Sequence, residues 1–263
     1  MIEDLIGNTP LYNLDKSKFN GKASVFAKLE MYNYTGSVKD RTALYMIVDA
    51  EQRGVLHKGG VIVEATSGNT GISLSAIGRA RGYRVVIVMP ESMTRERQDL
   101  MQAYGAEVVL SRAEEGMSGA LRLVEEILSK ENNAVSMRQF DNRANSRAHY
   151  ETTGREIYEQ TQGNIDVFVA GIGTGGTLCG VAKRLKEYRS SIEIIGVEPY
   201  ESPLITAGVV GVHKISGIGA DFIPSIYDDS VVDRVMTVSE SQAYKGVKRL
   251  MTDEGLLVGI SSG

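Results

Sequence analysis

Short runs of β-branched and aliphatic residues alternate along the chain with longer segments of helical periodicity. We expect strands at Ser24–Met31, Val61–Ala65, Arg84–Met89, Glu107–Ser111, Asp166–Ala170, Glu193–Val197 and Val232–Val238. We expect helices at Lys39–Arg53, Asn69–Arg81, Thr94–Tyr104, Gly116–Glu131, Thr152–Gln160, Thr177–Tyr188 and Ser239–Asp253. This alternation predicts parallel sheets whose strands are connected by crossover helices, and therefore an α/β fold.

A polar segment, Met137–Tyr150, interrupts the alternation near the middle of the chain. We therefore predict a boundary there between two α/β lobes, each with a mostly parallel sheet flanked by helices. The smaller lobe is expected to span residues 35–146, and the larger lobe residues 1–34 plus 147–263. Because small ligands commonly bind in the cleft between two such lobes, we expect the active site there.

The composition excludes several classes of function. Lys and Arg number 29 against 33 Asp and Glu, a net charge of −4, which does not favour nucleic-acid binding. No apolar run approaches the ~18 residues of a membrane span, and the acidic start Met1–Asp4 is not typical of a signal peptide. The single cysteine, Cys179, cannot form an intrachain disulfide. We therefore expect a cytoplasmic protein with neither nucleic acid nor membrane as partner.

Glycine is enriched, at 29 of 263 residues, and three glycine-rich turns each follow an expected strand and begin a helix. The unpaired N–H groups at a helix start suit anions. The first turn, Thr35–Arg41, carries Ser37 as a candidate N-cap and Lys39 in the first helical turn. The helix dipole disfavours a cation there, so we expect a lowered pKa and a nucleophilic amine. Alternatively, Lys39 is a solvated lysine paired with Asp40.

The second and third turns suit two different anions. The second turn consists of Thr66, Ser67, Gly68, Asn69, Thr70 and Gly71. Its hydroxyl, amide and N–H groups would hold a substrate carboxylate, or simply form an elaborate N-cap. The third turn, Gly171–Thr177, has GxGxxG spacing, and Glu198 ends the next strand, as in a dinucleotide site. Its hydroxyls on Thr174 and Thr177 also suit a phosphate monoester, so both interpretations stay open.

Other reactive residues lack the partners that their chemistry requires. Gly259–Gly263 has the GxSxG spacing of a nucleophile elbow, but neither an acid nor a histidine follows it. His57, His149 and His213 are scattered, so we predict no metal site. Cys179 lies within an expected helix and is interpreted as a buried structural thiol.

Together and in this order, the three turns resemble the β-family of pyridoxal-phosphate enzymes, fold type II, and within it the cysteine synthase (O-acetylserine sulfhydrylase) and cystathionine β-synthase branches. The resemblance extends over the whole chain. It is carried by Leu5–Leu11, Gly36–Arg41, Glu64–Gly71, Ala103–Glu107, Gln139–Asn142, Gly173–Thr177, Gly196–Pro199, Gly217–Gly219 and Gly259–Gly263.

The resemblance implies that pyridoxal 5'-phosphate is the cofactor and that Lys39 is its Schiff-base lysine and the catalytic base. The implied cofactor-binding residues are Lys39, Asn69, Gly173, Thr174, Gly175, Gly176, Thr177 and Ser261. The implied substrate-binding residues are Thr66, Ser67, Gly68, Asn69, Thr70, Gln139, Gly217 and Asp221. Glu198 then belongs to a strand-end motif rather than to a ribose site.

The implied reaction is β-replacement, which makes L-cysteine from O-acetylserine and sulfide, or adds a thiol, through an α-aminoacrylate intermediate. Asp221 resembles the cystathionine β-synthase branch. The alternative within the family is therefore an enzyme that uses serine or cysteine and releases cystathionine, lanthionine or hydrogen sulfide. The alternatives outside it are a nicotinamide-dinucleotide oxidoreductase and a non-catalytic binding module.

Three further expectations come with the resemblance. The enzyme is expected to be a homodimer. The smaller lobe, 35–146, is expected to be mobile and to close over the substrate. Resembling chains continue past Ser261–Gly263 into a helix, so we expect that this chain has been shortened there.

Overall fold

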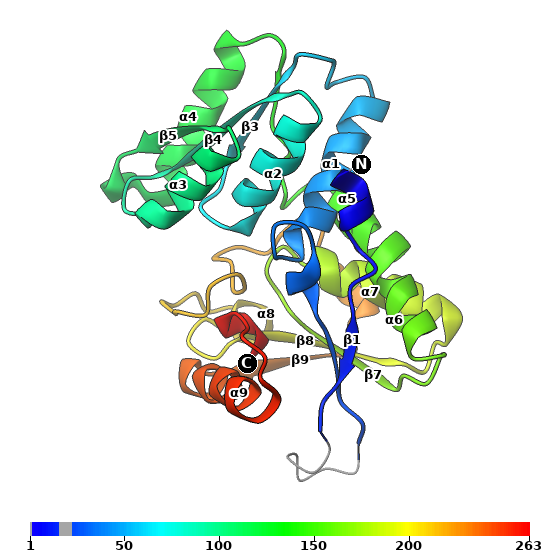
Figure 1. Cartoon of the computed structure of the whole chain (residues 1–263). Helices are drawn as coiled ribbons and strands as arrows, with labels where there is room; N and C mark the ends of the chain where they lie inside the picture. The colour runs from blue at the N-terminus through cyan, green and yellow to red at the C-terminus, as the bar shows by residue number, and fades with distance from the viewer. Residues whose placement is uncertain (1, 16–22) are drawn as a thin grey trace. The chain divides into compact units, whose positions relative to one another are not determined.

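The computed structural model describes residues 2–15 and 23–263 (Figure 1). The chain folds into two compact units. Unit 1 comprises Met1–Gly7 and Glu30–Asn145, and unit 2 comprises Asn8–Leu29 and Ser146–Gly263. Among the described residues, no helix combines the length and the apolar character needed to cross a membrane.

The assignment of the N-terminal residues to the units differs from the sequence-based expectation. Residues 1–7 and 30–34 were expected in the larger lobe but belong to unit 1. The reason is packing: Ile2 and Ile6 contact the hydrophobic core of unit 1. The segment between them and Glu30 belongs to unit 2, so the chain passes from one unit to the other and back before α1 begins.

Unit 1 is built on a parallel sheet with the strand order β5-β4-β3-β6. Its strands are β3 (Val61–Ala65), β4 (Arg84–Pro90), β5 (Glu107–Ser111) and β6 (Ala134–Val135). Its helices are α1 (Lys39–Gln52), α2 (Asn69–Ala80), α3 (Arg95–Ala103) and α4 (Gly116–Lys130).

Helices cover both faces of this sheet. Ile62 and Ile87 pack in the core that α1 and α2 share, whereas Val63 and Val88 pack against α4. All of β3 is buried, and so is β4 after Arg84. Apolar residues at consecutive positions therefore reach two different cores, as expected for a strand buried on both faces.

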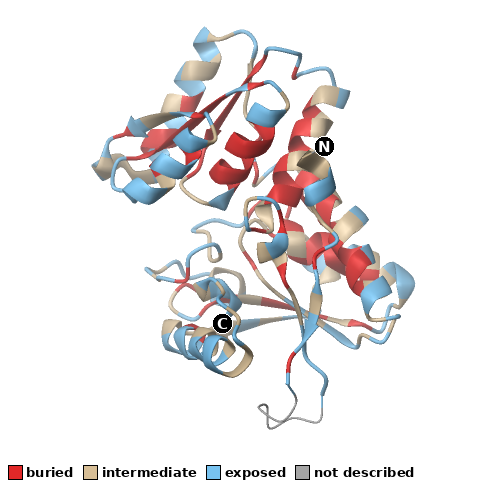
Figure 2. Cartoon of the chain, viewed as in Figure 1, coloured by how far each residue is buried: buried red, intermediate tan, exposed pale blue. Residues whose placement is uncertain are grey.

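Unit 2 contains a parallel sheet with the order β7-β8-β9. Its strands are β7 (Val167–Gly171), β8 (Glu193–Pro199) and β9 (Arg234–Val238), and its helices include α6 (Gly154–Gln160), α7 (Gly176–Tyr188), α8 (Leu204–Ala207) and α9 (Glu240–Glu254). Leu178 and Leu185 of α7 pack with Ile194 in its core. Figure 2 shows α9 largely exposed or intermediate, with only Ala243 buried.

Two segments differ in local structure from the sequence-based expectation. The two units divide within Met137–Tyr150, between Asn145 and Ser146, but the segment also contains a helix that was not expected. This helix, α5 (Arg143–Ala148), continues through a π-helical turn, His149–Thr153, into α6. The expected strand Ser24–Met31 is reduced to β2 (Phe26–Lys28), which pairs antiparallel with β1 (Leu11–Asn13). The pairing of β2 with β1 covers only three positions. In α5, a polar side chain has a tertiary partner, since the Thr42 hydroxyl donates to Asn145 Oδ1.

Candidate active site

The first glycine-rich turn places Lys39 at the first residue of α1. The N-cap is Val38, with φ −57° and ψ −21°, and not Ser37 as the sequence suggested. The Ser37 hydroxyl nevertheless accepts a hydrogen bond from the Lys39 N–H at 3.1 Å. Thus Ser37 supports the start of the helix without adopting the cap conformation.

The alternative of a solvated Lys39–Asp40 pair is wrong. Asp40 is buried, and its carboxylate accepts hydrogen bonds from the Thr35 N–H at 2.6 Å and the Thr35 hydroxyl at 2.5 Å. Among the described residues, the partly buried Lys39 ammonium forms no ion pair. Desolvation lowers the pKa of Lys39, and the negative charge of Glu30 opposes this shift. The direction of the shift is the expected one, and burial is its main cause.

The second turn connects β3 to α2 and has Gly68 as its N-cap. Thr66 and Thr70 are buried, whereas Asn69 is exposed. The Thr70 hydroxyl donates to Gln139 Oε1 at 2.6 Å, and the Thr66 hydroxyl accepts from the Gly68 N–H at 3.3 Å. The structure therefore brings Gln139 against this turn, as the predicted substrate site requires.

Sequence reasoning missed a residue that supports the second turn. Arg97 of α3 donates from Nη1 to the Ser67 carbonyl oxygen at 2.8 Å. Nothing in the local pattern of α3 distinguishes Arg97 from its charged neighbours Arg95 and Glu96. A long-range contact of this kind can be identified only from the fold.

The third turn connects β7 to α7, whose N-cap, Gly175, has φ +82°. A Cβ on Gly173 would lie 2.5 Å from the Gly217 carbonyl oxygen, so only glycine fits there. The N–H groups of Gly173 and Gly175 bond to no described residue. With the hydroxyls of Thr174 and Thr177, these N–H groups fit the several acceptor oxygens of a phosphate monoester.

His149 was interpreted from the sequence as an ordinary surface or core residue, yet it supports the third turn. It is buried in the π-helical turn, and its Nε2 lies 3.1 Å from the Thr177 hydroxyl. Its Nδ1 lies 3.0 Å from the Thr153 hydroxyl. Only the three-dimensional structure reveals this connection, because 28 residues separate His149 from Thr177.

Gly217 and Ser261 also lie beside the third turn within unit 2. The Gly219 N–H donates to the Ile172 carbonyl oxygen at 2.9 Å, and Gly217 itself has φ +98°. A Cβ on Gly217 would lie 3.8 Å from the Ser261 hydroxyl oxygen. Ser261 is exposed in a 3₁₀ turn, Ile260–Ser262. Asp221 follows this loop and is exposed.

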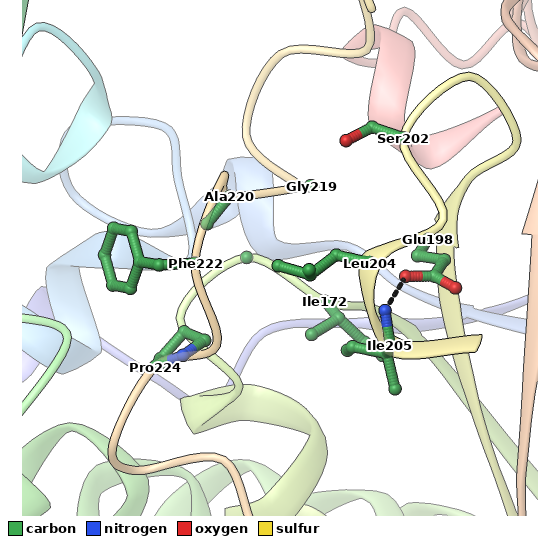
Figure 3. Close-up of a pocket in the computed structure, with 10 residues that line it drawn as sticks. Ile172, Glu198, Ser202, Leu204, Ile205, Gly219, Ala220, Phe222 and Pro224 are labelled. Carbon is green, nitrogen blue, oxygen red and sulfur yellow. Dashed lines mark hydrogen bonds between the residues drawn. The ribbon is translucent and has the colours of Figure 1, made fainter. Parts of the chain in front are cut away.

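A pocket borders the third turn (Figure 3). The residues that line it include Ile172, Gly173, Leu204, Gly219, Ala220 and Phe222. Glu198 is buried at this pocket and accepts hydrogen bonds from Ile205 N at 2.8 Å, Thr206 N at 2.9 Å and the Thr206 hydroxyl at 2.5 Å. Its carboxylate therefore holds the start of α8, and this weakens the alternative in which it binds a ribose.

The predicted site residues thus form one group in each unit. Lys39, Thr66–Thr70 and Gln139 belong to unit 1, whereas Gly173–Thr177, Gly217, Asp221 and Ser261 belong to unit 2. Cys179 is buried, as predicted, and accepts a hydrogen bond from the Asp228 N–H. Burial raises the pKa of its thiol, which is consistent with a structural role.

Comparison with known proteins identifies the family. The family model of pyridoxal-phosphate-dependent enzymes matches residues 2–263. The chain belongs to this family. The expected cofactor is thus pyridoxal phosphate, and the fold is that of fold type II. The dinucleotide and non-catalytic alternatives are set aside.

This pyridoxal-phosphate-dependent enzyme is also similar to individual curated proteins and solved structures. A cysteine synthase from Staphylococcus aureus is 45% identical over 100% of this chain and 84% of its own length. The crystal structure of a cysteine synthase from Entamoeba histolytica matches with a TM-score of 0.96 and 40% identity, over 100% of this chain and 79% of that one. A hydrogen sulfide-producing enzyme from Fusobacterium nucleatum matches with a TM-score of 0.93 and 43% identity, over 99% and 88% of the two chains. The chain is therefore a cysteine synthase-like enzyme.

Proposed function

We propose that this enzyme makes L-cysteine from O-acetylserine and sulfide by β-replacement. The observation that carries the proposal is Lys39, an unpaired lysine with a lowered pKa at the start of α1, in a chain of this family. The 45% identity to a cysteine synthase supports the choice of reaction.

The Lys39 amine is proposed to hold the cofactor by its aldehyde carbon. Once the amino group of the substrate has displaced it there, the freed Nζ is proposed to take the α-proton of the substrate. A lowered pKa favours this role, because a larger fraction of the amine is neutral and can accept a proton. Bound pyridoxal phosphate supplies an electron sink for the charge that develops at the substrate α-carbon. Release of the β-substituent then leaves a carbon that sulfide can attack.

The other residues bind and orient. Gly173–Thr177 is proposed to hold the cofactor phosphate with its N–H groups and two hydroxyls, and Asn69 and Ser261 to hydrogen-bond the ring. The Thr66–Thr70 turn and Gln139 are proposed to hold the substrate carboxylate. Holding the substrate carboxylate would orient the α-proton for transfer to Lys39, which is how positioning accelerates such a step.

The test is a product assay on the cofactor-loaded enzyme with O-acetylserine and sulfide, serine, or cysteine. We expect cysteine from the first pair and a loss of about a thousandfold in Lys39→Ala. Borohydride reduction should attach the cofactor to the peptide that contains Lys39. Lys130→Ala, an exposed lysine of α4, is the control and should behave as wild type. Turnover of another substrate pair, with no cysteine from O-acetylserine, would refute the proposal.

A second candidate function rests on Asp221 and on the similarity to a hydrogen sulfide-producing enzyme. Asp221 is an exposed acid between Ala220 and Phe222, which both line the pocket beside the third turn. There it would select an amino-acid thiol or activate a nucleophile, and serine or cysteine would be the first substrate. The product profile of Asp221→Ala distinguishes the two functions, since an unchanged profile leaves no role for this carboxylate.

We also propose that the enzyme is a cytoplasmic homodimer. The single buried thiol suits a reducing compartment. Light scattering of the cofactor-loaded enzyme would give its mass in solution. A mass of one chain, 28.6 kDa, would refute the dimer.

A further inference from the structure

A buried carboxylate on β3 holds a segment that lies more than 70 residues away in the sequence. Glu64 is 4% exposed. Its two oxygens accept hydrogen bonds of 2.8 to 3.3 Å from the Ser136 hydroxyl and from the backbone N–H groups of Met137, Arg138 and Gln139. Donors from four consecutive residues therefore converge on one side chain.

The arrangement suits a carboxylate better than any neutral group. Four donors point at Glu64, and an ionised carboxylate accepts hydrogen bonds on both oxygens without donating any. Burial raises the pKa of Glu64, and the hydrogen bonds from these four residues oppose that shift. Arg138 has φ +49°, a conformation that non-glycine residues rarely adopt. The bonds to Glu64 hold the backbone in this turn.

The carbonyl groups of the same segment are held as well. The Asn142 side chain donates to the Met137 carbonyl oxygen at 2.9 Å, and the Asn145 side chain donates to the Gln139 carbonyl oxygen at 2.8 Å. The backbone of Gln139 is thus fixed on both sides, by Glu64 and by Asn145. Its side-chain amide is held by neither of these two residues.

That amide reaches the turn that Glu64 itself precedes. Gln139 Oε1 accepts the hydrogen bond from the buried Thr70 hydroxyl at 2.6 Å. Glu64 lies on β3 only two residues before Thr66, where the turn begins. One side chain therefore connects the two segments that we propose bind the substrate carboxylate.

We propose that Glu64 is a positioning residue for the amino-acid substrate: it sets Gln139 in register with the Thr66–Thr70 turn. This role rests on the proposed function, because it assumes that the substrate carboxylate binds at Gln139 and this turn. Glu64 itself touches neither substrate nor cofactor and acts through the backbone of residues 136–139.

A double-mutant cycle tests the role. In Glu64→Gln the shape is kept, but an amide NH₂ must face one of the N–H donors. We expect its amino-acid affinity to fall about tenfold, with kcat changed much less, as for a lost binding interaction. The affinity is measured as the change in the visible absorbance of the cofactor-loaded enzyme on addition of O-acetylserine, serine or cysteine. In a Gln139→Ala background, Glu64→Gln should add little, because its effect passes through Gln139.

Hydrogen exchange gives a readout that does not depend on activity. The amides of residues 137–139 should exchange faster in Glu64→Gln than in wild type. Glu51→Gln is the matched control: this carboxylate of α1 also accepts several bonds, from Arg81 and Tyr83, but none from the substrate segments. It should leave both the amino-acid affinity and the exchange at 137–139 unchanged.

The outcomes separate the two proposals. Unchanged amino-acid affinity in Glu64→Gln, or effects of Glu64→Gln and Gln139→Ala that simply add, would overturn the role of Glu64. If Glu64→Gln does not fold, Ser136→Ala removes one donor and should lower the affinity by a few-fold. A wild-type enzyme that responds to none of the three amino acids would instead overturn the proposed function, and with it any substrate role for Glu64.

Discussion

Units 1 and 2 each carry a glycine-rich turn at the carboxyl end of a parallel sheet, but they support it in different ways. In unit 1, side chains support the turn: Gln139 contacts Thr70, and Arg97 contacts the Ser67 carbonyl. In unit 2, one side chain, His149, contacts Thr177, but the turn also depends on close backbone approach, since Gly173 lies against the Gly217 carbonyl. If the turns bind as proposed, we expect the carboxylate site to rely on adjustable side chains and the phosphate site to need its N–H groups at a fixed backbone position.

The two sheets differ as well. β3 of unit 1 is buried along its whole length, whereas β7 exposes 44% of Val167 and 56% of Val169, and β9 exposes 45% of Met236. Register pairing places Val169 and Met236 on the same face of the unit 2 sheet. Within the described residues this face is only partly covered. The apolar residues in the sequences of β7 and β9 did not distinguish these strands from β3.

The largest effect is expected from the tight glycine of the unit 2 turn. In Gly173→Ala the new Cβ would lie 2.5 Å from a backbone oxygen, so the turn must move. Its N–H groups would then no longer point toward the proposed phosphate position. We expect cofactor affinity to fall about a hundredfold, which equals ~2.8 kcal/mol. Gly68→Ala in the unit 1 turn meets nothing within 4 Å and should change that affinity less than about twofold. Fluorescence titration with pyridoxal phosphate measures both, and equal losses would remove the contrast between the turns.

The next prediction concerns the sheets. Val63 of β3 is fully buried, so Val63→Thr places a hydroxyl in an apolar core and should lower the free energy of unfolding by about 2 kcal/mol. Val169→Thr on the open face of β7 should change it by less than about 0.5 kcal/mol. Because valine and threonine have similar strand propensity, the two substitutions differ mainly in the burial of their sites and form a matched test. Urea unfolding of the two variants gives the comparison, and a large loss in Val169→Thr would mean that the face is covered in solution.

A smaller effect is expected at the π-helical turn beside the proposed phosphate site. His149→Ala removes the partner of the Thr177 hydroxyl and should weaken cofactor binding about tenfold, the value of a buried hydrogen bond. Thr153→Ala removes only the contact to the other ring nitrogen and should cost less. The dissociation constants of pyridoxal phosphate, measured for both variants and for wild type, test this order of effects. An unchanged value in His149→Ala would show that Thr177 needs no support.

Strand and helix periodicity was enough to predict the parallel strands β3, β4, β5, β7, β8 and β9, because their apolar runs are bounded by turns. It did not predict β6, which has only two residues. It did not predict α5, whose polar residues include one with a distant partner: Asn145 Oδ1 accepts a hydrogen bond from the Thr42 hydroxyl, 103 residues away in the sequence. It also did not predict the pairing of β1 with β2, since three-residue strands carry too little pattern.

In the candidate site, too, residues with a local sequence signal were predicted, and residues with distant partners were not. Residues in local turns, such as Lys39 and Thr174, were identified because glycine and hydroxyl residues at a helix start have a direct physical meaning. Supporting residues such as His149 and Arg97 were not, because their partners lie 28 and 30 residues away and the spacing carries no signal. Ser37 shows the remaining error: the residue type suited a cap, but the backbone placed Val38 there.

The smallest effect concerns the charge of Lys39. Among the described residues no carboxylate forms an ion pair with it as Glu51 does with Arg81, although the charge of Glu30 acts on it. Its pKa is lowered in the folded chain, so the unfolded chain binds more protons in the interval between the lowered pKa and the ordinary value of 10.5. Lys39 therefore destabilises the fold fully below that interval, and the penalty disappears as the pH rises through 10.5. We expect the cofactor-free Lys39→Met variant to be more stable than wild type at pH 7, with the difference shrinking toward pH 10.5. Urea unfolding at several pH values measures this, and a constant difference would mean that the Lys39 amine is as well solvated as a surface lysine.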